Sequence, residues 1–150
     1  MTFSHDGLRD SLTHLAAPPY FYENLRRELT SATRNESSLT LVRFQLFSNA
    51  DSHVISDQDS KYEIAIISFA ELIKSATRAE DLCARLGKFE FTLILKAPIE
   101  VGMLLSLRVS KSWNSENFLC QSALVQAQRG ENSLEILNRL DSQELFRYTP

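Results

Sequence analysis

The chain has 150 residues, a formal net charge of -3 and a pI near 5.6. Hydrophobic residues make up 43% of it and charged residues 23%, which is typical of a globular domain and excludes disorder along the whole chain. The acidic balance argues against a broad basic surface for nucleic acid, and no apolar run is long enough to span a bilayer. With two cysteines and no apolar N-terminal signal, we expect a domain of the reducing cytoplasm without a disulfide framework.

Periodic apolar positions predict the elements of the N-terminal half. Pro18 and Pro19 can start a helix that continues to about Asn35. Its apolar positions are Phe21, Leu25, Leu29 and Ala32. Residues 39–47 are apolar on both faces of a strand and predict a covered, central position, whereas the polar stretch 48–60 predicts a loop. A second helix is indicated by a stripe of apolar residues: Tyr62, Ile66, Phe69, Ala70 and Ile73.

The C-terminal half begins with two short strand candidates around a tight turn. Residues 81–86 and 89–96, with Gly87-Lys88 between them, predict a β-hairpin. Residues 101–113 predict a helix, and its apolar positions are Met103, Leu104, Leu107 and Val109. A strand over 118–128 follows, and a last helix is marked by Leu134, Leu137, Leu140 and Leu145. The order α-β-α-β-β-α-β-α indicates an α/β (α+β) fold with a mixed central sheet flanked by helices.

The hairpin and the residues before it carry the most specific pattern. Residues 78–91 read RAEDLCARLGKFEF, which resembles the R-x-x-D-x-x-x-R-x-G-G-D-E-F signature of the GGDEF domain, the module of bacterial diguanylate cyclases. Residues 10–17, DSLTHLAA, stand where that family has D-x-L-T-x-L-x-N, and Ser122 matches a typical family serine. The resemblance runs from about Asp10 to Arg147, so we expect residues 1–150 to form a single GGDEF-like domain.

The departures from the family pattern fall on its catalytic positions. The strand-end Asp that helps bind Mg²⁺ is Gln45 here, the metal-binding acid of the third signature position is Phe89, and the second signature glycine is Lys88. Two further altered positions, which meet the nucleotide in the family, are Ala17 and Thr149. Glu63, in place of the guanine-reading Asp, and Glu90 remain. Because phosphoryl transfer depends on metal-assisted charge stabilisation, the resemblance implies a degenerate domain without a metal site, a cofactor or cyclase activity.

A second site of the family is retained in the sequence. Arg78 and Asp81 match the R-x-x-D inhibitory site, which binds cyclic di-GMP away from the catalytic centre. A guanidinium fork suits the O6 and N7 acceptors of guanine, and a carboxylate accepts from its N–H groups. At the end of the predicted helix, three-residue spacing would put both side chains on one side. The resemblance implies a further arginine, Arg108, and we expect Arg85 and Lys88 to add positive charge.

Two interpretations stay open. The first is an inactive GGDEF-like domain that senses cyclic di-GMP through Arg78 and Asp81 in a bacterial cytoplasm, with an unidentified signalling protein as partner and ligand-driven homodimers as an expectation. The second is an interaction or dimerisation scaffold that binds no nucleotide, in which Arg78 and Asp81 are a solvated surface pair. An open notch around these two residues favours the first, and side chains paired elsewhere favour the second. Residual GTP binding through Glu63 is a weaker third interpretation, and no pattern indicates a nucleic-acid or membrane partner.

Overall fold

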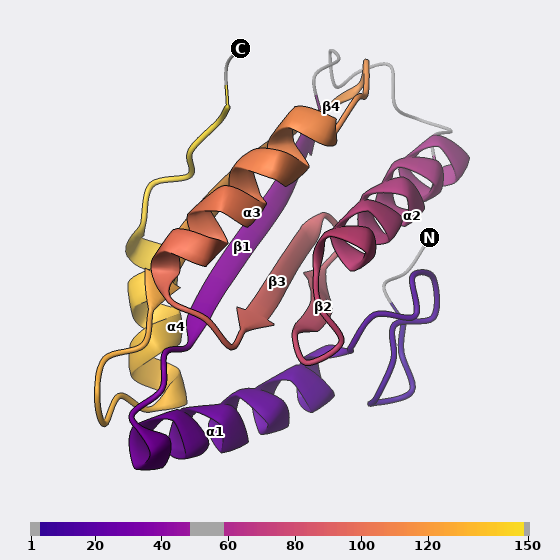
Figure 1. Ribbon diagram of the computed structural model, residues 1–150. Coiled ribbons are helices and arrows are strands. Elements are labelled where there is room, and N and C mark those ends of the chain that lie inside the picture. The colour runs from indigo at the N-terminus through magenta and orange to yellow at the C-terminus, as the bar shows by residue number, and fades with distance from the viewer. Residues whose placement is uncertain (1–3, 49–58, 149–150) are drawn as a thin grey trace.

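The computed structural model describes residues 4–48 and 59–148 (Figure 1). Its elements are α1 (Pro18–Asn35), β1 (Thr40–Ser48), α2 (Asp59–Ala76), β2 (Leu82–Gly87), β3 (Glu90–Leu95), α3 (Ile99–Ser112), β4 (Phe118–Gln126) and α4 (Ser133–Ser142). The predicted order is therefore confirmed. Most of the loop predicted over 48–60, and Thr149, lie outside the described residues.

The four strands form one sheet in the order β2-β3-β1-β4, and every neighbouring pair is antiparallel. The prediction of a sheet flanked by helices is confirmed, but the prediction that the sheet is mixed is wrong for the described strands. Strands β1 and β2 run in one direction and β3 and β4 run in the other. The order of the sheet alternates the two directions, so strands that run in the same direction are never adjacent. In the described part of the chain, parallel pairing is limited to a single bridge between Ala16 and Ala84.

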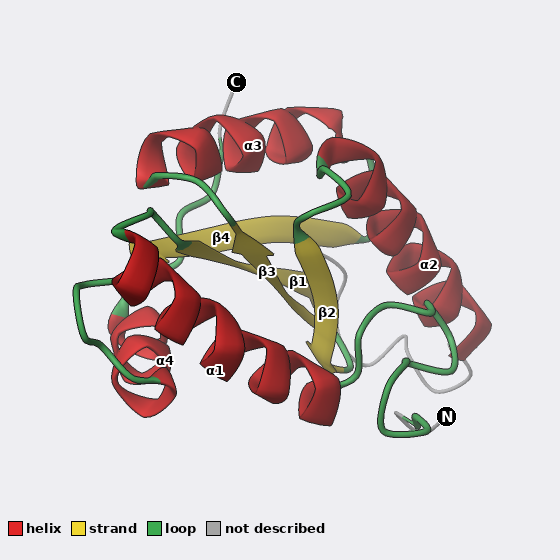
Figure 2. Cartoon of the chain, turned by 60° about the horizontal axis from the view of Figure 1, so that its bottom comes forward, coloured by secondary structure: helices red, strands yellow, loops and turns green. Residues whose placement is uncertain are grey.

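Two helices cover each face of the sheet (Figure 2). Helices α2 and α3 pack on one face over a core that includes Val42 and Phe44, and α1 and α4 pack on the other over Leu39 and Leu41. Strand β1 is thus buried on both sides, which explains its continuous apolar sequence. The predicted apolar positions of α1 are all buried, as are Ile66, Phe69, Ala70 and Ile73 of α2.

Helix α3 presents a different face to the sheet from the one that its sequence predicts. Val109 is buried as expected, but Met103, Leu104 and Leu107 are 56%, 65% and 37% exposed. The helix instead packs through Gly102, Leu105, Ser106 and Val109, two of which are small. A Cβ added to Gly102 would lie 2.9 Å from a methyl group of Leu124, so glycine is what lets this helix approach β4 closely.

The C-terminal helix is shorter than the leucine pattern predicts. Helix α4 begins with a capping box, in which Asn132 accepts from the backbone N–H of Glu135 and Glu135 accepts in return. It ends at Ser142, so Leu145 lies beyond it. The extended chain that follows pairs with the outer edge of β4 through two backbone hydrogen bonds between Ser122 and Phe146. None of the described helices is both long and apolar enough to cross a membrane.

Candidate functional site

The signature turn of the hairpin is packed into an aromatic cluster. The Phe89 ring lies 5.4 Å, centroid to centroid, from Tyr62 on α2 and 5.4 Å from Phe118 on β4. Tyr62 and Phe118 are 5.5 Å apart, so the three rings contact one another. The Nζ of Lys88 lies 5.0 Å from the centroid of Tyr62 and 5.5 Å from that of Phe89. In this aromatic cluster (Tyr62, Phe89 and Phe118), the residue at the third signature position, Phe89, presents a phenyl ring and no carboxylate.

A polar group lies on the opposite face of the sheet, where β1 and β3 run side by side. Gln45 and Glu90 are direct partners in the register. The Nη2 of Arg43 donates to Gln45 Oε1 at 2.8 Å, and its Nε lies 3.5 Å from Glu90 Oε2. Sequence reasoning overlooked Arg43. The signal that could have found it is a lone charged residue within an apolar strand, two positions before Gln45 and therefore on the same face.

The Arg78-Asp81 pair lies in a turn rather than on a helix, because α2 ends at Ala76. The Asp81 carboxylate accepts from the backbone N–H of Arg78 at 3.0 Å and from that of Lys96 at 3.3 Å. It therefore fixes the turn against the end of β3. The Arg78 side chain is exposed, and among the described residues its guanidinium has no hydrogen-bond or ion-pair partner.

Arg108 reaches the same region from α3. Its exposed guanidinium donates through Nη2 to the carbonyl of Ala76 at 3.2 Å, two residues before Arg78. The fold thus brings Arg108 to the end of α2, where the R-x-x-D turn begins. Arg78 and Arg108 are 30 residues apart in the sequence, and the packing of α2 against α3 brings their two regions together.

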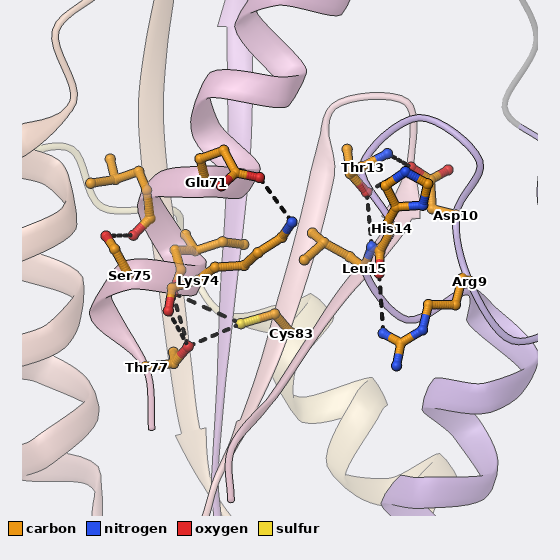
Figure 3. Close-up of polar contacts among 12 residues, drawn as sticks. Arg9, Asp10, Thr13, His14, Leu15, Glu71, Lys74, Ser75, Thr77 and Cys83 are labelled. Carbon is orange, nitrogen blue, oxygen red and sulfur yellow. Dashed lines mark hydrogen bonds and ion pairs between the residues drawn. The ribbon is translucent and has the colours of Figure 1, made fainter. Parts of the chain in front are cut away.

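Arg85 does not contribute to this surface, contrary to the sequence expectation. Its side chain is 1% exposed, and its Nη1 contacts both carboxylate oxygens of Asp10, at 3.0 and 3.1 Å. Its Nε and Nη2 donate to the carbonyl of Lys88. A buried charge needs such compensation, and Asp10 is itself held by the N-terminal turn, where it accepts from Thr13 (Figure 3). Arg85 is therefore a core residue that supports the hairpin turn.

The other candidate groups offer no nucleophile or metal cluster. Burial raises the pKa of the Cys83 thiol, which contacts the Thr77 hydroxyl (Figure 3), and burial raises the pKa of Cys120 to about 12. Both thiols are thus protonated and unreactive at neutral pH. Glu63 is half-buried on α2 beside Tyr62. Across residues 4–48 and 59–148, no three His, Cys, Asp or Glu side chains gather in an arrangement that could hold a metal ion.

Comparison of the sequence with known proteins identifies a family. The model described as "Diguanylate cyclase, GGDEF domain" matches residues 8–123. The diguanylate cyclase DgcS of Shewanella oneidensis is 26% identical over 117 residues, which cover 75% of this chain and 38% of that protein. The chain therefore spans well under half the length of this curated relative.

Solved structures share the fold. The diguanylate cyclase SiaD of Pseudomonas aeruginosa, in complex with its activator SiaC, superposes with a TM-score of 0.77 at 23% identity, covering 89% of this chain and 55% of SiaD. The coiled coil and GGDEF domain of DgcB from Caulobacter crescentus, in complex with c-di-GMP, gives 0.77 at 18% identity, covering 91% and 78% of the two chains. At these sequence identities the similarity establishes the fold alone. Any statement about function has to be argued from the residues of the sites.

Proposed function

The chain belongs to the GGDEF family of diguanylate cyclase domains, and we propose that it binds cyclic di-GMP without synthesising it. The observation that carries the proposal is the convergence of Arg78, Asp81 and Arg108 at the end of α2. The exposed guanidinium of Arg108 contacts the Ala76 carbonyl, two residues before the turn that holds Arg78 and Asp81. Structural relatives of this fold include a GGDEF domain in complex with c-di-GMP.

The chemistry of this surface suits a guanine dinucleotide. The Arg78 guanidinium has no competing partner among the described residues, and its planar fork matches the O6 and N7 acceptors of guanine. Each oxygen of the Asp81 carboxylate accepts one hydrogen bond from a backbone N–H. A carboxylate has about four acceptor positions, so Asp81 can still accept from the N–H groups of guanine. Arg78 and Arg108 supply positive charge for a ligand with two phosphate groups.

The absence of synthesis is supported by the residues at the catalytic positions. Joining two GTP molecules requires charge stabilisation at the transferring phosphoryl group, which a divalent metal ion normally provides. Here the third signature residue belongs to an aromatic cluster, and Gln45 and Glu90 face the Arg43 guanidinium. This donor set, with one carboxylate and one amide, does not fit a metal ion that prefers several hard oxygen ligands.

Calorimetric titration with cyclic di-GMP tests the binding proposal. We expect micromolar affinity for the wild-type protein and a loss of at least about tenfold in Arg78→Ala, because a charge-assisted bidentate contact contributes about 1.5–3 kcal/mol. Arg129→Ala is the matched control, since Arg129 is an exposed arginine that pairs with Glu36 next to α1. Absence of binding at high ligand concentration, or equal binding by Arg78→Ala, would contradict the proposal.

One observation supports the alternative of an interaction scaffold. Helix α3 exposes Met103 and Leu104, and neighbouring α2 exposes Ile64, which is 66% accessible. Apolar side chains in such numbers on adjacent helices favour contact with another protein. A domain that fails the cyclic di-GMP titration but loses a protein partner on Leu104→Asp would belong to this second class.

A further inference from the structure

We propose that the positively charged guanidinium of Arg43 prevents a divalent metal ion from binding at the sheet face that carries Gln45 and Glu90. This inference rests on the proposed loss of cyclase chemistry and is independent of ligand binding at Arg78. The inference gives Arg43, which lies outside the signature stretch 78–91, a role in excluding metal ions.

The geometry places one guanidinium against both oxygen-bearing side chains. Arg43 and Gln45 are two residues apart on β1, and Glu90 is the cross-strand neighbour of Gln45 on β3. The Nη2–Oε1 distance to Gln45 is 2.8 Å, and the Nε–Oε2 distance to Glu90 is 3.5 Å. The Arg43 side chain is only 17% exposed and that of Glu90 is 34% exposed, so water screens this group only in part.

The position of the charge matters more than the strength of either contact. The Arg43 Nε is buried and makes no hydrogen bond, so its approach to Glu90 is an ion pair without ideal geometry. The guanidinium is nevertheless held on a strand whose neighbours on both sides are paired along its length. A divalent ion that approached Gln45 and Glu90 would meet a fixed positive charge within a few ångströms, and like charges at that distance repel strongly in a partly buried site.

On this face of the sheet two barriers to metal binding are therefore separable, whereas the acid missing at Phe89 is a further loss on the other face. The first is the missing acid at position 45, and the second is the charge at position 43. Gln45→Asp removes only the first, because the new carboxylate would pair with Arg43. Gln45→Asp combined with Arg43→Gln removes both and leaves two carboxylates on neighbouring strands facing each other. Carboxylate pairs of this kind are typical ligands of Mg²⁺ and Mn²⁺.

The test is Mn²⁺ titration of the two variants, with free Mn²⁺ measured by electron paramagnetic resonance and folding checked by thermal melting. We expect the double variant to bind at least about tenfold more tightly than Gln45→Asp alone. Gln45→Asp with Arg129→Gln is the matched control and should behave like Gln45→Asp. Adding Glu90→Gln to the double variant should abolish the gain, which places the ion between residues 45 and 90.

Equal Mn²⁺ affinity with and without Arg43, or no binding in the double variant, would overturn the proposal. Arg43→Met, which keeps an unbranched side chain without the charge, replaces Arg43→Gln if that variant does not fold. Because the readout is metal binding, a negative result here leaves the cyclic di-GMP titration unaffected. A negative cyclic di-GMP titration likewise leaves the role of Arg43 intact.

Discussion

The Asp10–Arg85 ion pair lies in the interior of the domain. Both side chains are buried, with 0% and 1% exposure, and the guanidinium also donates to the Lys88 carbonyl. A buried ion pair adds little net stability relative to apolar residues, but removing one partner leaves an uncompensated charge. The pair therefore makes the N-terminal turn a structural requirement of the hairpin.

Replacing one member of this pair should destabilise the domain strongly. For Asp10→Asn we expect the free energy of unfolding to fall by about 3–5 kcal/mol, because Arg85 keeps its charge in a buried position. Urea denaturation followed by circular dichroism measures the change. The control is Glu36→Gln at the exposed Arg129–Glu36 pair, where a loss of about 0–1 kcal/mol is expected. Similar losses in both variants would show that burial of the Asp10–Arg85 pair has no special cost.

At the level of elements, the hairpin is held to the rest of the molecule by the aromatic cluster. Phe89 lies in the turn between β2 and β3, yet its ring contacts α2 and β4 through Tyr62 and Phe118. An acid at this position would have to face water or a cation, whereas a phenyl ring is stabilised by burial. Phe89 therefore makes the hairpin turn part of a packing contact between the turn, α2 and β4.

Phe89→Ala should loosen the hairpin without unfolding the domain. Phe89 is half-buried, so we expect a loss of about 2 kcal/mol from the removed apolar area and edge-to-face contacts. Thermal unfolding gives the stability, and hydrogen exchange should locate the effect in β2 and β3. Phe146→Ala, at a 63% exposed position, is expected to change stability by less than about 1 kcal/mol. Exchange rates in β2 and β3 that match those of the wild type would argue against this anchoring role.

Element order was predictable from the sequence because helix and strand periodicities are strong and some of the turns contain glycine or proline, as at Gly87 and Gly130. The face that α3 presents was not predicted, because apolar residues lie on both sides of this helix and the packed side also contains the small residues Gly102 and Ser106. At the sites, Arg78, Asp81 and Arg108 follow from spacing and family resemblance. The burial of Arg85 and the contacts of Arg43 depend on cross-strand neighbours, which local patterns do not contain.

The molecule as a whole combines the GGDEF fold with two separate surfaces, the proposed inactive face around Gln45 and Glu90 and the proposed binding surface of Arg78, Asp81 and Arg108. The family matches and the antiparallel sheet with two helices on each face establish the architecture. The proposed inactive face lies at the hairpin end of β1, whereas the Arg78 turn lies where α2 leads into β2. The proposed loss of chemistry at the first surface therefore does not require loss of the proposed binding at the second.

The proposed inactivity predicts that this chain produces no cyclic di-GMP from GTP. We expect a rate at least about a thousandfold below that of an active diguanylate cyclase assayed in parallel, because the proposal removes the metal-assisted stabilisation of the phosphoryl group. Chromatographic detection of the product, with Mg²⁺ and with Mn²⁺, measures it. Steady product formation with either metal would contradict the assignment of this domain as a binding protein.

The outer edges of the sheet have a consequence for self-association. Beside β2, Ala16 forms a bridge with Ala84, and beside β4, Phe146 forms a bridge with Ser122. Each edge strand thus uses part of its outer backbone hydrogen-bonding groups within its own chain. Unpaired groups on an exposed edge strand promote pairing with strands of other molecules. Pairing of a second molecule along the whole length of either edge would require the displacement of Ala16 or Phe146, so the two bridges shorten the edge that is open to fibre-like assembly.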